Sequence, residues 1–433
     1  GVQTCALPIS LSLGTTACVG DLDVTPIDPN YQLINDAASL DNLFNKCYAT
    51  LAMAGNSDVD GDVDVDGIDG GTSGFIRQMW NSNELTSDEA ICAWGDEGIP
   101  GFNYNSYDGS HPMLRGYYYR LYTAITYCNH YLAMAEELGA DAVKVAEIRF
   151  LRALEYYLAL DGFGGRIPFI KEFDSTGAPA ARGRINEDGY AGYEVFDFIE
   201  SELLDIEGTL ASARVAAEGQ DGYGRVDQVA AWTLLSRLYL NSEVYTGTPR
   251  WAKAKEYAEK VINGPHKLWT SGANGWTAYQ MLFMGDNGEN GASVEAVLPL
   301  LGDGITTTSY GTSMFLMSSC WKDDMDLNGD FGMVGKFWAG NRARKQLVQK
   351  FFPNDDAPQV GISDMATAAG DDRALFHGTD RTLSVETPGE FASGYSVGKF
   401  RNTYSTGASP HSTNFPDADY FLMRSAEAYL IAA

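Results

Sequence analysis

The sequence predicts a mainly α-helical protein in which a helical-repeat scaffold carries a large loop-rich region for ligand binding. Apolar residues recur at alternating steps of three and four through residues 112–263, which is the spacing of helices that bury one face. The same pattern returns at 417–433. Residues 55–111 and 264–416 are instead rich in Gly, Asn, Asp, Ser and aromatic residues, as binding loops on a rigid scaffold are.

Five helices are expected in the first scaffold segment, and residues 417–433 are expected to form a sixth. One apolar stripe marks the first helix: Leu114, Tyr118, Leu121, Ile125, Cys128 and Leu132. The second follows Ile148, Leu151, Leu154 and Leu158 and ends at Gly162, Gly164, Gly165 and Pro168. Apolar residues of the next three lie at 195–206, 226–238 and 254–261. Short turns pair these helices, although the insert at 162–189 interrupts any regular repeat of about 34 residues.

Composition limits the classes of partner. The 433 residues contain 30 Lys and Arg against 58 Asp and Glu, which gives a formal net charge of −28. Such a charge repels nucleic acid and anionic lipid headgroups, so a neutral or cationic ligand fits better. No stretch has the roughly 18–20 consecutive apolar residues that a membrane-spanning helix needs.

The sequence carries no motif for catalysis, and we expect a binding protein with no catalytic residues. The five histidines form no zinc-binding H-E-x-x-H pair, and the nucleophile-elbow, P-loop and dinucleotide-binding motifs are missing. A glycoside hydrolase needs only two carboxylates at a set separation, so that alternative stays open.

An acidic run is the one candidate metal site. Asp62, Asp64, Asp66 and Gly67 match the first half of a calcium loop, but position 12 of that loop is Ser73 rather than a glutamate. The run predicts either a structural calcium ion or a solvated acidic loop, and no other cofactor is expected.

The two ends of the sequence carry separate expectations. Residues 1–10 are similar to translated sequencing-adapter sequence, and we expect them to be a non-native leader. Residues 11–18 resemble the end of a lipoprotein signal peptide, which makes Cys18 the expected lipidation site; an ordinary cysteine is the alternative. The last residues have a helical pattern without a closing Gly or Pro, so we expect the natural protein to be longer.

Six stretches, in order along the chain, carry a family resemblance. The most specific are 147–157 (EIRFLRALEYY) with its closing turn at 162–168, and 420–430 (YFLMRSAEAYL). The others lie at 76–90, 122–129, 230–240 and 251–262. Together they resemble the SusD-like (RagB/SusD) family of outer-membrane nutrient-binding lipoproteins, from residue 20 to the last.

The resemblance implies one domain over 19–433 with a tetratricopeptide-like helical superhelix. It also implies a lipid-anchored, outward-facing protein of the outer membrane that binds oligo- or polysaccharide and delivers it to a TonB-dependent transporter. Of the motif residues, Arg149, Arg152, Arg424 and Glu427 are interpreted as structural or docking groups. A family member that binds a peptide or glycoprotein fragment is the alternative within the family, and a pure interaction scaffold is a further one.

Aromatic residues in the loop-rich regions supply the candidate glycan site. Aromatic rings stack on the C–H faces of sugars, while neighbouring polar groups hydrogen-bond the hydroxyls. The predicted stacking residues are Trp94, Tyr107, Tyr310, Trp321 and Trp338. Their predicted hydrogen-bonding companions are Arg77, Asn81 and Asp96.

Overall fold

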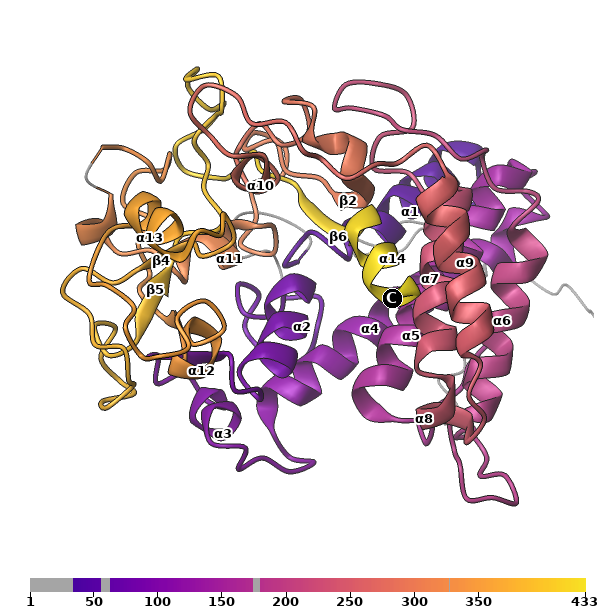
Figure 1. Cartoon of the computed structure of the whole chain (residues 1–433). Helices are drawn as coiled ribbons and strands as arrows, with labels where there is room; N and C mark the ends of the chain where they lie inside the picture. Colours follow the sequence, from indigo (N-terminus) through magenta and orange to yellow (C-terminus); the bar gives the residue numbers. More distant parts are fainter. Residues whose placement is uncertain (1–33, 56–62, 174–179, 327) are drawn as a thin grey trace, which may run out of the picture.

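The computed structural model describes residues 34–55, 63–173, 180–326 and 328–433. Figure 1 shows helices stacked side by side along one side of the molecule, while the other side holds short elements joined by long connections. The helical side consists of α1 (Ala37–Ala49), α4 (Pro112–Ala135), α5 (Ala142–Phe163), α6 (Tyr193–Ile206), α7 (Gln228–Leu240), α8 (Ser242–Thr246) and α9 (Trp251–Asn263). The predicted mainly α-helical class and the five helices within 112–263 are confirmed.

Neighbouring helices pack against one another in pairs, α4 against α5, α5 against α6 and α7 against α9. Side-chain caps begin two of them, because the carboxylates of Asp141 and Asp227 accept hydrogen bonds from the first backbone N–H groups of α5 and α7. Gly164, with a φ of 74°, ends α5 in a conformation that favours glycine. The apolar stripes meet in one large core.

Ion pairs between helices engage Arg149 and Arg152, two of the motif residues interpreted as structural or docking groups. Arg149 and Arg152 of α5 both bind Glu202 of α6, with N–O distances of 2.8 Å. Glu147 of α5 is almost fully buried and binds Arg225 just before α7. These groups therefore hold the scaffold together rather than face a ligand.

The predicted sixth helix over 417–433 is only half correct. Residues Tyr420–Arg424 form strand β6, which pairs antiparallel with β2 (Ala296–Leu300), and α14 (Ser425–Ala432) follows directly. The run Phe421–Met423 is buried on both faces, so its apolar residues show no period that separates strand from helix. Arg237 of α7 binds the carboxylate of Glu427 and donates to the Leu422 carbonyl oxygen, which fixes α14 on the scaffold.

The region predicted as loop-rich contains a small sheet as well as short helices. Four antiparallel strands lie in the order β1 (Ala90–Cys92), β3 (Asn341–Ala343), β5 (Tyr395–Val397) and β4 (Phe376–His377). Around them lie α2 (Phe75–Glu84), α3 (Ile99–Asn103), α10 (Ala278–Met281), η2 (Ala292–Glu295), α11 (Met314–Ser318), η3 (Asp323–Met325), α12 (Lys345–Val348) and α13 (Ile362–Ala369). Within the described ranges, no helix combines the length and apolarity needed to cross a membrane.

Candidate ligand-binding site

Five of the predicted site residues line one pocket of about 340 Å³, which we call the aromatic pocket. They are Arg77, Trp94, Asp96, Tyr310 and Trp338. Residues from three distant parts of the sequence meet here, because α2, the segment after β1 and the segment before β3 converge beside α11. The structure adds Asp69, Gly71, Thr72 and Phe315 to the lining.

Two of the predicted rings, Tyr310 and Trp94, are arranged around the third, Trp338. The ring centroids of Tyr310 and Trp338 are 5.4 Å apart with the planes at 89°, and those of Trp94 and Trp338 are 6.5 Å apart at 57°. Phe315 supports Trp94 edge-on at 6.3 Å. All three predicted rings are only partly buried, so they keep surface available to a ligand.

Strand pairing places Trp94. Cys92 is opposite Asn341 in the β1–β3 pair, and the Ala93 amide donates to the Gly340 carbonyl oxygen at 2.8 Å. The Trp94 indole then lies against Gly340, where a Cβ atom would come within 2.3 Å of the ring. Its Nε1–H donates to the Trp338 carbonyl oxygen at 2.9 Å. Gly340 is thus required for the position of the indole.

Arg77 supplies the main polar group of the pocket. Its guanidinium donates to Asp96 at 2.7 Å and to Thr72 Oγ1 at 3.1 Å. It also lies over the Trp94 ring at 5.3 Å, which fixes the guanidinium plane. Its buried Nε has no hydrogen-bond partner among the described residues. Below the pocket, burial raises the pKa of the Cys92 thiol to about 12, so this thiol stays neutral.

Tyr310 is held by close backbone packing on both sides. The neighbouring Ser309 hydroxyl accepts from the Ala54 amide at 2.8 Å. Gly311 lies so close to Gly74 that a Cβ on Gly74 would be 2.8 Å from the Gly311 Cα. The segment is therefore locked against the start of α2, which fixes the tyrosine at the pocket.

This arrangement combines partly exposed ring faces, a guanidinium and two carboxylates around an open pocket. Rings of this kind stack on an apolar face of a ligand, and the charged groups form hydrogen bonds with hydroxyls at the ligand's edge. The geometry suits recognition of a neutral polyhydroxylated molecule.

Comparison with known proteins decides the family. No family model matches the chain. A curated relative, the starch-binding protein SusD of Bacteroides thetaiotaomicron, is 37% identical over an alignment that covers 99% of this chain and 79% of the relative. The chain belongs to the SusD family.

Solved structures, among them SusD-like proteins, share its fold. A laminarin-binding SusD-like protein aligns with a TM-score of 0.63 at 16% identity, over 92% of this chain and 80% of that one. A SusD superfamily protein from Parabacteroides distasonis gives 0.61 at 18% identity, over 92% and 75%. The surface glycan-binding protein A of Bacteroides thetaiotaomicron, in complex with laminarihexaose, gives 0.58 at 14% identity, over 92% and 78%. The predicted SusD-like fold is confirmed.

Three predicted site residues lie elsewhere in this SusD-family fold. Trp321 is fully buried and stacked on Phe331 at 5.0 Å, so it presents no ring face to a ligand, contrary to the prediction. Asn81 is also buried, and its amide donates to the Met113 sulfur atom. Tyr107 is exposed but packs edge-on against Phe102, outside the aromatic pocket.

The acidic run gives little support for a calcium ion. Both carboxylate oxygens of Asp64 accept hydrogen bonds from the buried Arg120 guanidinium at 2.8 Å, so they are already engaged. Asp66 is exposed, and Asp62 lies outside the described residues. Among the residues that the structure places, no group of three or more His, Cys, Asp or Glu could hold a metal ion. Calcium binding stays a prediction.

Sequence reasoning missed Asp69, Thr72 and Phe315. Asp69 was visible only as the end of the acidic run, which suggested a cation rather than a glycan. Its carboxylate accepts the Thr72 amide at 3.1 Å, and this turn brings Thr72 beneath Arg77. Phe315 belongs to a short apolar run that looks like core. The predicted lipidation site, Cys18, lies outside the described residues.

Proposed function

We propose that the protein is a surface-exposed lipoprotein of the outer membrane that binds an oligo- or polysaccharide in the aromatic pocket and delivers it to a TonB-dependent transporter. The observation that carries this proposal is the meeting of Trp94, Tyr310 and Trp338 around one open pocket with Arg77 and Asp96. We also propose that it acts by binding alone, with no catalytic step.

Starch is the glycan that we propose first. The relative that is 37% identical is named a starch-binding protein, whereas the laminarin-binding structures are 16% and 14% identical. An α-glucan offers neutral glucose units with apolar faces for the rings and hydroxyls for Arg77 and Asp96. Laminarin is therefore the second glycan to test, because two solved structures with the same fold are named for binding it or its hexasaccharide.

Affinity electrophoresis of the purified protein in gels with soluble starch, laminarin and other plant, host and microbial polysaccharides tests the binding. We expect retardation by starch, loss of retardation in Tyr310→Ala and no loss in Tyr107→Ala, which removes the same type of ring outside the pocket. Absence of retardation by every glycan would refute the proposal and favour a peptide ligand or a scaffold role.

A parallel assay for released reducing sugar tests the absence of catalysis. The aromatic pocket holds two carboxylates, Asp69 and Asp96, and a glycoside hydrolase would use such a pair. We expect no sugar release. Release that Asp96→Asn abolishes would establish hydrolysis instead.

Lipid anchoring and surface exposure need a cellular test. In Bacteroides cells expressing the full chain behind its natural leader, we expect labelled palmitate on the protein and its loss in Cys18→Ala. Protease added to intact cells should digest the anchored protein. Protection from protease would place the protein on the inner side of the membrane. Co-purification with a TonB-dependent transporter tests whether the protein is positioned to deliver glycan to it.

A further inference from the structure

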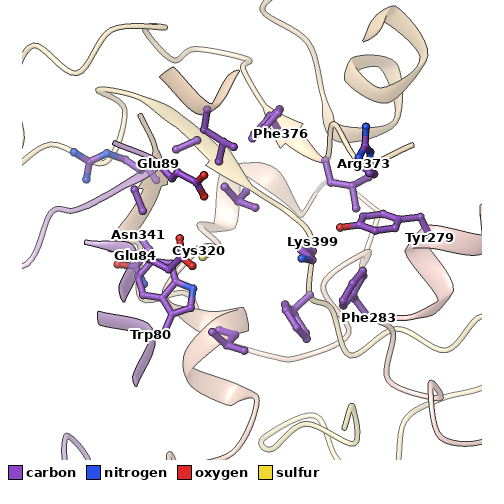
Figure 2. A pocket seen from close by; sticks show the side chains of 18 of the residues that line it. Trp80, Glu84, Glu89, Tyr279, Phe283, Cys320, Asn341, Arg373, Phe376 and Lys399 are labelled. Carbon is purple, nitrogen blue, oxygen red and sulfur yellow. The ribbon is translucent and has the colours of Figure 1, made fainter. Parts of the chain in front are cut away.

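A second cavity, of about 470 Å³, lies on the other side of α11 from the aromatic pocket. Phe315 lines the aromatic pocket, and its neighbour Leu316 lines this one. We call it the charged pocket, because acidic and basic side chains face each other across it (Figure 2). Its volume lies within the range of about 300–1,000 Å³ that is typical of sites for small ligands.

One side of the charged pocket gathers oxygen acceptors. Glu84 ends α2, Glu89 precedes β1, and Asn341 begins β3; Figure 2 shows all three on the same side, with Trp80 next to them. Neither carboxylate has an ion pair or a side-chain hydrogen bond in the part of the chain that the structure describes. Burial and the neighbouring charge of Glu89 raise the pKa of Glu84, while Lys399 opposes this shift.

Asn341 adds a buried acceptor to this side. The residue is 1% exposed, and its amide nitrogen donates to the Ser319 hydroxyl at 2.9 Å. Its Oδ1 atom is buried and has no hydrogen-bond partner among the described residues. A buried acceptor without a partner is unfavourable, so a ligand that donates a hydrogen bond to it is favoured.

The opposite side of the charged pocket carries a cation. The Lys399 ammonium lies 4.4 Å from the Phe283 ring centroid and 5.8 Å from that of Tyr279, and within the described ranges no carboxylate pairs with it. The three arginines of the lining are engaged. Arg373 binds Asp371 and Arg424 binds Glu295. The buried Arg342 guanidinium donates to three backbone carbonyl oxygens, those of Gly340, Pro388 and Ser393. Lys399 is therefore the cation that is available to a ligand.

Apolar side chains form the walls between the two charged sides. They include Leu316, Leu347, Phe351, Leu375, Phe376 and Phe400. A sugar in this position would leave hydroxyls without partners against these walls. A purely apolar ligand would instead remove water from Glu84 and Lys399 without replacing it. The complementary ligand has an ammonium group at one end, an anion at the other and an apolar body.

We propose that the charged pocket binds a small zwitterion with an apolar side chain, an α-amino acid or a dipeptide. The ammonium group faces Glu84, Glu89 and Asn341 Oδ1, which offer acceptors for its three N–H donors. The carboxylate faces Lys399, and the side chain packs against the phenylalanines. This site is separate from the glycan site, and its test does not depend on glycan binding.

Isothermal titration of the full chain with leucyl-leucine and with phenylalanine tests the proposal. N-acetyl-leucyl-leucine lacks the ammonium group and leucyl-leucinamide lacks the carboxylate, so each should bind about tenfold or more weakly than leucyl-leucine. Glu84→Gln and Lys399→Gln should weaken leucyl-leucine similarly. The matched variants Glu137→Gln and Lys255→Gln change exposed residues outside the pocket and should leave its affinity unchanged.

Three results would overturn the proposal. They are no heat of binding at millimolar leucyl-leucine, equal affinity for the acetylated and free dipeptides, and equal affinity in Glu84→Gln and wild type. If Glu84→Gln fails to fold, the two blocked dipeptides still decide the question with the wild-type protein. Starch retardation should be the same with and without leucyl-leucine, which separates this site from the aromatic pocket.

Discussion

Replacing Trp338 by alanine is the sharpest test of the aromatic pocket. The indole contacts Tyr310 edge-on at 5.4 Å and Trp94 at 6.5 Å, so it is the central ring of the three. A sugar stacked on one indole face buries on the order of 80 Å² of apolar surface, and at about 25 cal/mol per Å² its loss costs about 2 kcal/mol. This corresponds to about a 30-fold increase in Kd.

The substitution should leave the fold intact. The Trp338 amide donates to the Ser318 carbonyl oxygen and its own carbonyl accepts from Trp94, and alanine keeps both backbone groups. Titration of wild type and Trp338→Ala with maltoheptaose gives the two Kd values. Thermal denaturation of both proteins gives their Tm and shows whether the variant is folded. Trp251→Ala is the matched control, because it removes a 58% exposed tryptophan at the start of α9, outside the pocket.

The control should bind with the wild-type Kd. A folded Trp338→Ala protein whose Kd stays within about twofold of wild type would refute the assignment of the glycan to this pocket, because twofold is only about 0.4 kcal/mol.

Three further predictions concern residues that hold the fold and the aromatic pocket in place. Gly340→Ala places a Cβ 2.3 Å from the Trp94 indole, so we expect it to weaken maltoheptaose binding as much as Trp94→Ala does; titration of both variants checks this. Asp64→Asn leaves the buried Arg120 without its carboxylate and should lower the free energy of unfolding by about 3–5 kcal/mol in urea denaturation, whereas a loss below about 1 kcal/mol would contradict the pairing. Burial raises the pKa of Glu155 to about 8 from an ordinary 4.5, so the folded state keeps a proton that the unfolded state releases. The free energy of unfolding should therefore fall as the pH rises from about 4.5 to about 8, and Glu155→Gln should reduce this fall; equal pH slopes in urea titrations of the two proteins would exclude it.

Long helices with one apolar face were predictable from the sequence, because their pattern repeats over several turns. The short elements were not. Helix α1 is a different case: it has 13 residues, as α7 and α9 do, and buries Leu40, Leu43, Phe44 and Cys47 on one face, so its apolar pattern was present in the sequence although no helix was predicted there. Strand β6 was read as helix because its partner, β2, lies more than a hundred residues earlier in the chain. Pairing over that distance leaves no local signal.

For the aromatic pocket, residue type was a good guide and burial was the missing information. Trp321 and Trp338 lie 17 positions apart in the same loop-rich segment, and nothing local distinguishes them. Trp321 is buried because Phe331 covers its face, and its Nε1 donates to the Phe400 carbonyl oxygen at 2.9 Å. These contacts come from the tertiary fold, which the sequence pattern does not encode locally.

The aromatic pocket depends on strand register more than on its loops. The β1–β3 pair sets Trp94 beside Gly340, and a shift by one residue would turn Trp94 to the other face of the sheet. It would also place Ala339, which has a Cβ atom, where the indole needs a glycine. The two indoles are therefore fixed by three-residue strands, whereas the segment 329–337 that leads into Trp338 is not part of the sheet. No residue of that segment lines the aromatic pocket, so substitutions there leave the stacking rings and their polar neighbours unchanged.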